Sequence, residues 1–123
     1  MIFRNRLIGT AVVAVALGSV GAGLAAAPPV GPLPPGPSST VKTTEGQLVA
    51  FALPHRTGGR VWRVARAPKA SILRQVSEAD VGNQVVLVYV ATGRGTTSVA
   101  FGLTVGERAK AYESRRYTVS VAP

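Results

Sequence analysis

The 123-residue chain contains no cysteine and a single histidine, His55. Without cysteine there is no disulfide, no nucleophilic thiol and no zinc-thiolate site. One histidine does not make a multi-histidine metal centre. For catalysis, His55 would need a carboxylate to orient it, and Asp80 could do so only if the tertiary fold brought the two residues together. We therefore expect no catalytic residues, no metal and no cofactor, and a protein that is not an enzyme.

Acidic residues are also scarce, since five Asp and Glu stand against 14 Lys and Arg, a formal charge of +9. Such a surface favours acidic partners, anionic lipid or polyanions. The basic residues are spread over predicted strands and loops and do not form one run. Dispersed charge is typical of a solvated surface. The N-terminal residues, described next, predict export, and an exported protein rarely meets nucleic acid. We therefore expect no nucleic-acid partner.

The first 27 residues have the three parts of an export signal. Arg4 and Arg6 precede an apolar run from Leu7 through Leu24, and small residues follow. Cleavage after Ala25 makes residues 1–25 a signal peptide and the mature protein secreted or periplasmic, without stable membrane insertion. The alternative is an uncleaved membrane anchor, because about 20 apolar residues can span a bilayer.

Residues 26–39 are rich in proline, with six prolines from Pro28 onward, together with glycine and serine. This composition cannot build a core and favours extended polyproline II geometry. We interpret the segment as a linker, or as a processing remnant without a role of its own. The folded domain is expected to comprise residues 40–123.

Alternation of apolar and polar residues predicts an all-β domain. Residues 84–91 and 96–103 are expected to form a central hairpin with a turn at 92–95, and residues 78–83 a loop leading into it. The run at 84–91 is apolar on both faces, which suits a strand with neighbours on both sides. With further candidate strands at 40–44, 47–53, 60–66, 71–76 and 115–121, the pattern predicts an immunoglobulin-like β-sandwich of about seven strands without a disulfide. Trp62 is expected to be a core anchor that bridges the two sheets.

The order of several features along residues 40–121 carries a family resemblance. These features are Leu53-Pro54, then Thr57-Gly58-Gly59-Arg60-Val61-Trp62, then Gly82, then Gly95, then Val99, Phe101 and Leu103, and finally Tyr117, Val119 and Val121. The chain resembles the chagasin-like inhibitors of papain-family cysteine peptidases. The resemblance implies an immunoglobulin-like fold, a monomer, and inhibition by loops that occlude the active-site cleft of a papain-like cysteine peptidase.

The resemblance places the peptidase-binding residues on two loops, which comprise His55, Arg56, Thr57, Gly58, Gly59 and Arg60, and then Gly82 and Asn83. The family carries Asn-Pro-Thr-Thr-Gly-Tyr followed closely by Trp in the first loop. Thr57, Gly59 and Trp62 keep that pattern, whereas His55, Arg56, Gly58 and Arg60 depart from it. The family's Gly-x-Gly-Gly segment is reduced to Asp80-Val81-Gly82-Asn83.

The family's third motif, Arg-Pro-Trp, is absent around Val105-Gly106-Glu107, which removes the aromatic and cationic anchors of that motif. Residues 80–83 and 105–114 would flank the loop that enters the cleft. Two functions follow from this pattern. The first is a cysteine peptidase inhibitor that acts by loop occlusion. The alternative is an envelope binding or structural module that keeps the fold and does not inhibit.

Overall fold

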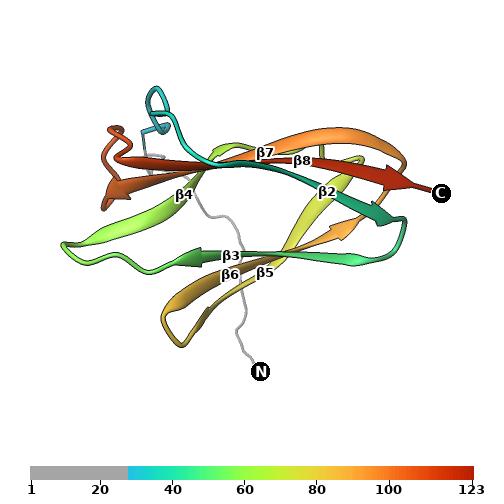
Figure 1. Ribbon diagram of the computed structural model, residues 1–123, viewed down its shortest axis with the longest axis horizontal. Helices are drawn as coiled ribbons and strands as arrows, with labels where there is room; N and C mark the ends of the chain where they lie inside the picture. The colour runs from blue at the N-terminus through green and yellow to red at the C-terminus, as the bar shows by residue number, and fades with distance from the viewer. Residues whose placement is uncertain (1–27) are drawn as a thin grey trace, which may run out of the picture.

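The computed structural model describes residues 28–123, and this part of the chain is all β, with seven strands and no helix (Figure 1). The strands are β2 (Ser38–Thr44), β3 (Leu48–Pro54), β4 (Arg60–Arg66), β5 (Leu73–Val81), β6 (Gln84–Ala91), β7 (Gly95–Val105) and β8 (Glu113–Ala122). The predicted signal peptide and the alternative anchor lie outside the described residues. From Pro28 onward, nothing helical is present that could cross a bilayer.

Two sheets form the two layers seen in Figure 1. One sheet has the strand order β2-β8-β7-β4 and the other the order β3-β6-β5. All neighbouring strands are antiparallel except β2 and β8, which are parallel. The prediction of an immunoglobulin-like β-sandwich of about seven strands is confirmed.

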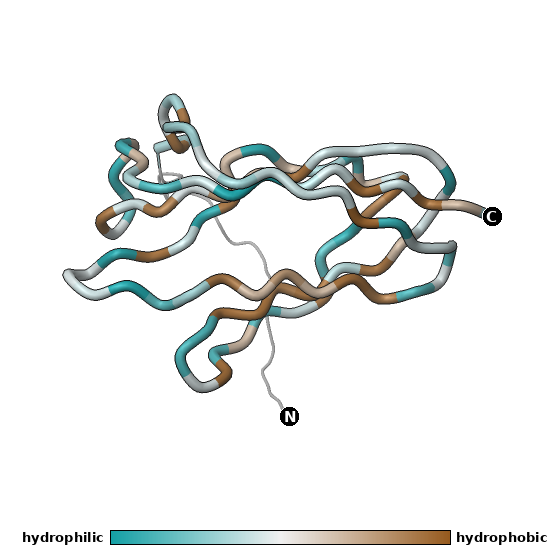
Figure 2. Tube along the Cα trace, in the orientation of Figure 1, coloured by the Kyte–Doolittle hydropathy of each residue, from teal (hydrophilic) through white to brown (hydrophobic). Residues whose placement is uncertain are grey.

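The core lies between the sheets because successive side chains of a strand point to opposite faces. In β3, Val49, Phe51 and Leu53 are buried, and the residues between them are exposed. Figure 2 shows hydrophobic positions concentrated along β3 and β6. The ring of Phe51 lies 5.5 Å from that of Tyr89 and 4.4 Å from that of Tyr117, centroid to centroid. Since Tyr117 is on β8, this aromatic cluster joins the two sheets.

Strand β6 is the central strand of its sheet, as predicted, but it does not form a hairpin with β7. Both edges of β6 are paired, with β3 on one side and β5 on the other, so β7 pairs with β4 and β8 in the other sheet. The segment between them crosses from layer to layer, and the Thr92 N–H donates to the Ile72 carbonyl at 2.8 Å. Residues 92–95, which were predicted to be the turn of a hairpin, therefore connect one sheet to the other.

The loop expected at residues 78–83 is instead the end of β5, which runs to Val81 and leaves only Gly82 and Asn83 as a turn before β6. Gly82 has a φ of 61°, a conformation that glycine adopts without strain. Strand β5 is at the edge of its sheet. Edge strands keep charged side chains in water, so Glu78 and Asp80 are compatible with a strand there.

The proline-rich residues lie against the four-stranded sheet. The Gly31 N–H donates to the Ala109 carbonyl at 2.6 Å, the Ser114 hydroxyl to the Pro34 carbonyl at 2.7 Å, and the Arg116 N–H to the Pro37 carbonyl at 3.0 Å. The segment interpreted as a linker thus contacts the domain from Pro28 to Pro37, where the Pro28 carbonyl accepts a hydrogen bond from Arg63. Strand β2 begins at Ser38, before the expected boundary at residue 40.

Gly102 of β7 shows how closely this contact is packed. A Cβ atom at this position would lie 2.8 Å from Val30 Cγ1 and 3.0 Å from Leu33 Cδ2. At 2.8 Å the Val30 side chain would have to shift, and at 3.0 Å the contact with Leu33 would be tighter than most carbon contacts. Glycine at position 102 therefore favours close packing where the proline-rich residues cross the outer face of β7.

The buried phenol of Tyr89 predicts a loss of stability at alkaline pH. Tyr89 is only 2% exposed. Burial raises its pKa to about 12, with a smaller contribution from the negative charge of Glu78. Above pH about 10 the phenol ionises in the unfolded chain while it stays neutral in the fold. The free energy of unfolding should therefore decrease as the pH rises from about 10 to about 12, by roughly 2–3 kcal/mol from this group.

Urea denaturation of the wild type and of a Tyr89→Phe variant across this range measures the effect. The phenylalanine variant should lose this part of the pH dependence. Identical alkaline slopes for the two proteins would contradict the assignment to Tyr89.

Candidate functional site

Three connections meet at one end of the sandwich, on the left of Figure 1. Residues 55–59 join β3 to β4, residues 82–83 join β5 to β6, and residues 106–112 join β7 to β8. The His55 N–H donates to the Asn83 carbonyl at 2.9 Å, and the Gly106 N–H donates to the Gly59 carbonyl at 3.1 Å. The structure therefore brings together the two loops that the sequence indicated, and places the third loop beside the first.

The tip of the first loop depends on glycine for its backbone conformation. Gly58 and Gly59 have φ values of 78° and 71°, in the left-handed region. A Cβ atom at either position would meet nothing within 4 Å. The conformation, and not crowding, therefore favours glycine here, and the tip offers open backbone to a partner.

The single histidine is paired with a carboxylate across two loops. His55 Nε2 lies 3.2 Å from Asp80 Oδ1, with side chains that are 42% and 77% exposed. The sequence placed these residues 25 positions apart, and only the tertiary fold brings them together. An exposed pair of this kind stabilises little. It adds a second link between the end of β3 and the β5–β6 turn.

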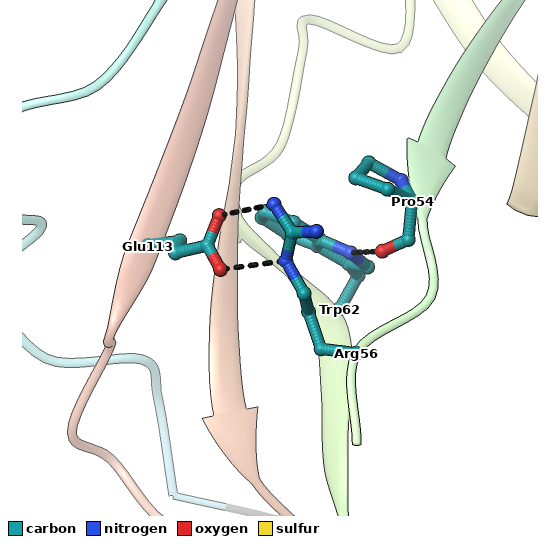
Figure 3. A network of polar contacts seen from close by, with 4 residues as sticks. All are labelled: Pro54, Arg56, Trp62 and Glu113. Carbon is teal, nitrogen blue, oxygen red and sulfur yellow. Dashed lines mark hydrogen bonds and ion pairs between the residues drawn. The ribbon is translucent and has the colours of Figure 1, made fainter.

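Arg56 forms a bidentate ion pair with Glu113, which is the best-defined polar contact at this end of the sandwich (Figure 3). Arg56 Nε donates to Glu113 Oε2 at 2.8 Å, and Nη2 donates to Oε1 at 3.0 Å. The strand register aligns Glu113 and Trp62 on either side of Leu103, a core residue, so the carboxylate faces the first loop. Sequence reasoning missed this pair because its members are 57 residues apart.

The ion pair predicts a titration at acid pH. The hydrogen bonds from Arg56 hold the pKa of Glu113 below its usual range. A carboxyl with a lowered pKa in the fold contributes stability above its ordinary pKa of about 4.3, and this contribution is lost as the pH falls through the lower value. An NMR titration should show the Arg56 Nε–H signal moving with a midpoint below pH about 4.3. A Glu113→Gln variant should show no such transition, and a wild-type midpoint above that pH would contradict the pairing.

Aromatic and cationic side chains gather over the third loop. Tyr112 is 40% exposed. Its ring centroid lies 4.4 Å from the Arg60 guanidinium carbon and 5.0 Å from Lys110 Nζ. The expected absence of aromatic and cationic anchors concerned Val105-Gly106-Glu107 alone, where Arg-Pro-Trp is absent. The sequence nevertheless offers other cationic and aromatic residues directly after it, at the alternate positions Arg108, Lys110 and Tyr112.

Trp62 stands between this end and the core. It is half-buried and packs against the core cluster, and its indole N–H donates to the Pro54 carbonyl of the opposite sheet at 2.8 Å. The Arg115 guanidinium carbon lies 5.8 Å from the ring centroid. Trp62 bridges the sheets as predicted, but it is not fully buried because β4 is the edge strand of its sheet.

Comparisons with known proteins give a likeness at the level of the fold. No protein-family model matches the chain, and no curated protein sequence matches it. Among solved structures, the chain is similar to the cysteine protease inhibitor EhICP2 from Entamoeba histolytica, with a TM-score of 0.53 and 13% sequence identity, over 72% of this chain and 100% of that chain. An inhibitor fold of similar size is therefore a structural neighbour.

Proposed function

We propose that this protein inhibits papain-type cysteine peptidases by inserting residues 55–60 into the active-site cleft, with Gly82 and Asn83 beside them. One observation carries the proposal. Three loops are joined by backbone hydrogen bonds at one end of a fold that is similar to a cysteine protease inhibitor. The protein would act by occlusion and not by catalysis.

The geometry of the loops favours binding without a large ordering cost. Binding costs free energy when loops must be ordered, and prior ordering lowers that cost. Here Arg56 is held by Glu113, His55 by Asn83, and Gly59 by Gly106 before any partner is present. Glycine at positions 58 and 59 leaves no side chain to keep the backbone away from a peptidase's catalytic residues.

The departures from the family pattern predict weak inhibition. The guanidinium of Arg56 is occupied by Glu113, so this side chain holds the loop and is not free to grip a partner. Affinity at interfaces is concentrated in a few anchors, each worth about 2 kcal/mol or more. With the Arg-Pro-Trp anchors absent, we expect affinity below that implied by the family pattern.

Inhibition of a panel of papain-type peptidases by purified residues 26–123 tests the proposal. We expect reversible inhibition that is competitive with substrate, with the protein recovered intact after incubation. Inhibition of none of the enzymes at high protein concentration would refute it. That result would favour the alternative, a non-inhibitory envelope binding or structural module on the same fold.

Export is the second part of the proposal. The charged start, apolar middle and small-residue end of residues 1–27 support secretion or release into a periplasm. Mass spectrometry of the protein from cell fractions should give a mature chain that begins near Ala26. Recovery of the full-length chain in the membrane fraction would support the anchor instead.

A further inference from the structure

The fold gathers cations that are dispersed in the sequence. Residues 55–60 and 106–115, together with Arg63, contain six Lys or Arg side chains and two carboxylates. Arg63 belongs to this group because its guanidinium donates to the Arg108 carbonyl at 2.8 Å. We call these residues the basic end. At the opposite end, Arg94 lies 3.5 Å from Glu45, so a cation there has a carboxylate close to it.

The carboxylates do not neutralise the basic end. Glu113 is engaged by Arg56, and Glu107 is the second acidic residue of these ranges. Asp80, on the adjacent strand, lies against His55. The positive charges of Arg115 and Arg60 also lower the pKa of Glu113, so one carboxylate is shared among three arginines. Arg108 and Lys110 are exposed on the third loop. The cations of the basic end therefore outnumber the carboxylates close to them.

Tyr112 is the point where this charge is most concentrated. Two cations share its ring, at 4.4 Å and 5.0 Å from the centroid, and the tyrosine is 40% exposed. Each cation is attracted to the face of the ring, and this attraction is modest at an exposed site. Both like charges lie within 5.0 Å of one ring centroid, and like charges at such a range repel each other. An incoming carboxylate would relieve that repulsion while the ring supplies apolar contact.

We propose, on the basis of the function proposed above, that the basic end selects peptidases whose cleft is rimmed by carboxylates, and that Tyr112 with Arg60 and Lys110 is the anchor that contacts this acidic rim. Complementary charge acts mainly on association rate and on partner choice. The protein would therefore discriminate among papain-type peptidases by the sign of their surface charge, and its association would weaken as salt screens the charges.

The experiment measures association rate constants of the mature protein with two papain-type peptidases, one acidic and one basic, at about 0.05 M and about 0.5 M salt. Lys110→Glu and Tyr112→Ala are the test variants. Lys42→Glu is the matched control, because Lys42 is exposed on β2, outside the basic end, and the substitution changes the net charge by the same amount.

We expect faster association with the acidic peptidase, at least a tenfold decrease with Lys110→Glu at low salt, and a clear decrease in affinity with Tyr112→Ala. Lys42→Glu should change the rate about twofold or less. At high salt the Lys110→Glu difference should shrink.

Inhibition by the wild type that is equal for both peptidases and indifferent to Lys110→Glu would overturn this inference and leave the proposed function standing. No inhibition by the wild type would overturn both. Binding to anionic lipid vesicles that is lost in Lys110→Glu, with peptidase association unchanged, would also overturn it and assign the basic end to a membrane surface.

Discussion

Replacing Trp62 by alanine is expected to lower the free energy of unfolding by about 3 kcal/mol or more. The indole packs against the core cluster, and its N–H is bonded to the Pro54 carbonyl of the opposite sheet at 2.8 Å. The substitution removes the packing and leaves that carbonyl without its donor. Because small domains are stable by only about 5–15 kcal/mol, this is a large fraction of the total. Urea denaturation followed by circular dichroism measures it.

Two variants separate the contributions of the indole. Trp62→Phe keeps an aromatic ring and loses the hydrogen bond, and should cost about 1 kcal/mol beyond the difference in ring size. Val61→Ala is the control, because the neighbouring Val61 is 46% exposed and should change stability little. A Trp62→Ala variant that unfolds at the wild-type denaturant concentration would contradict the bridging role.

Inserting bulk at Gly59 is expected to abolish peptidase inhibition while the domain stays folded. The loop tip is open, since a Cβ at Gly59 meets nothing within 4 Å. An indole there would project into the space that the peptidase must occupy. Loss of one anchoring contact of an interface costs about 2 kcal/mol or more, which is roughly a 30-fold decrease in affinity. We therefore expect Gly59→Trp to raise the inhibition constant at least 30-fold.

Gly46→Trp is the matched control for this substitution. Gly46 also has a positive φ, 87°, and also meets nothing within 4 Å, but it lies in the β2–β3 turn at the opposite end. Both variants therefore pay a similar backbone strain of about 1–2 kcal/mol. Equal inhibition by the two variants would move the peptidase-binding surface away from residues 55–60.

Local pattern was sufficient for most of the fold. The alternation of Val49, Phe51 and Leu53 with small residues gives β3 correctly because the side-chain period of a strand is two. The continuous apolar run of β6 correctly predicts that this strand lies between two others, because such a strand has neighbours on both sides. Which strands pair with each other was harder to predict. The turn residues at 92–95 fit a hairpin and a connection between sheets equally well.

The contacts of the candidate site could be predicted only in part. The loops were located from glycine and proline positions, which are local signals. The Arg56–Glu113 and His55–Asp80 pairs depend on strand register and on which ends of the sandwich coincide. The docking of the proline-rich residues was missed for a similar reason. Their composition predicts an extended chain. The surface on which they pack includes Gly102, which lies on a strand far along the sequence and leaves room for Val30 and Leu33.

Binding to a single papain-type peptidase in two states tests the central claim most directly. In one state the cleft is free, and in the other a small covalent inhibitor occupies it. If residues 55–60 enter the cleft, purified residues 26–123 should bind the free enzyme and lose that binding when the cleft is filled. Equal binding to both states would contradict occlusion of the cleft by the loops of this sandwich.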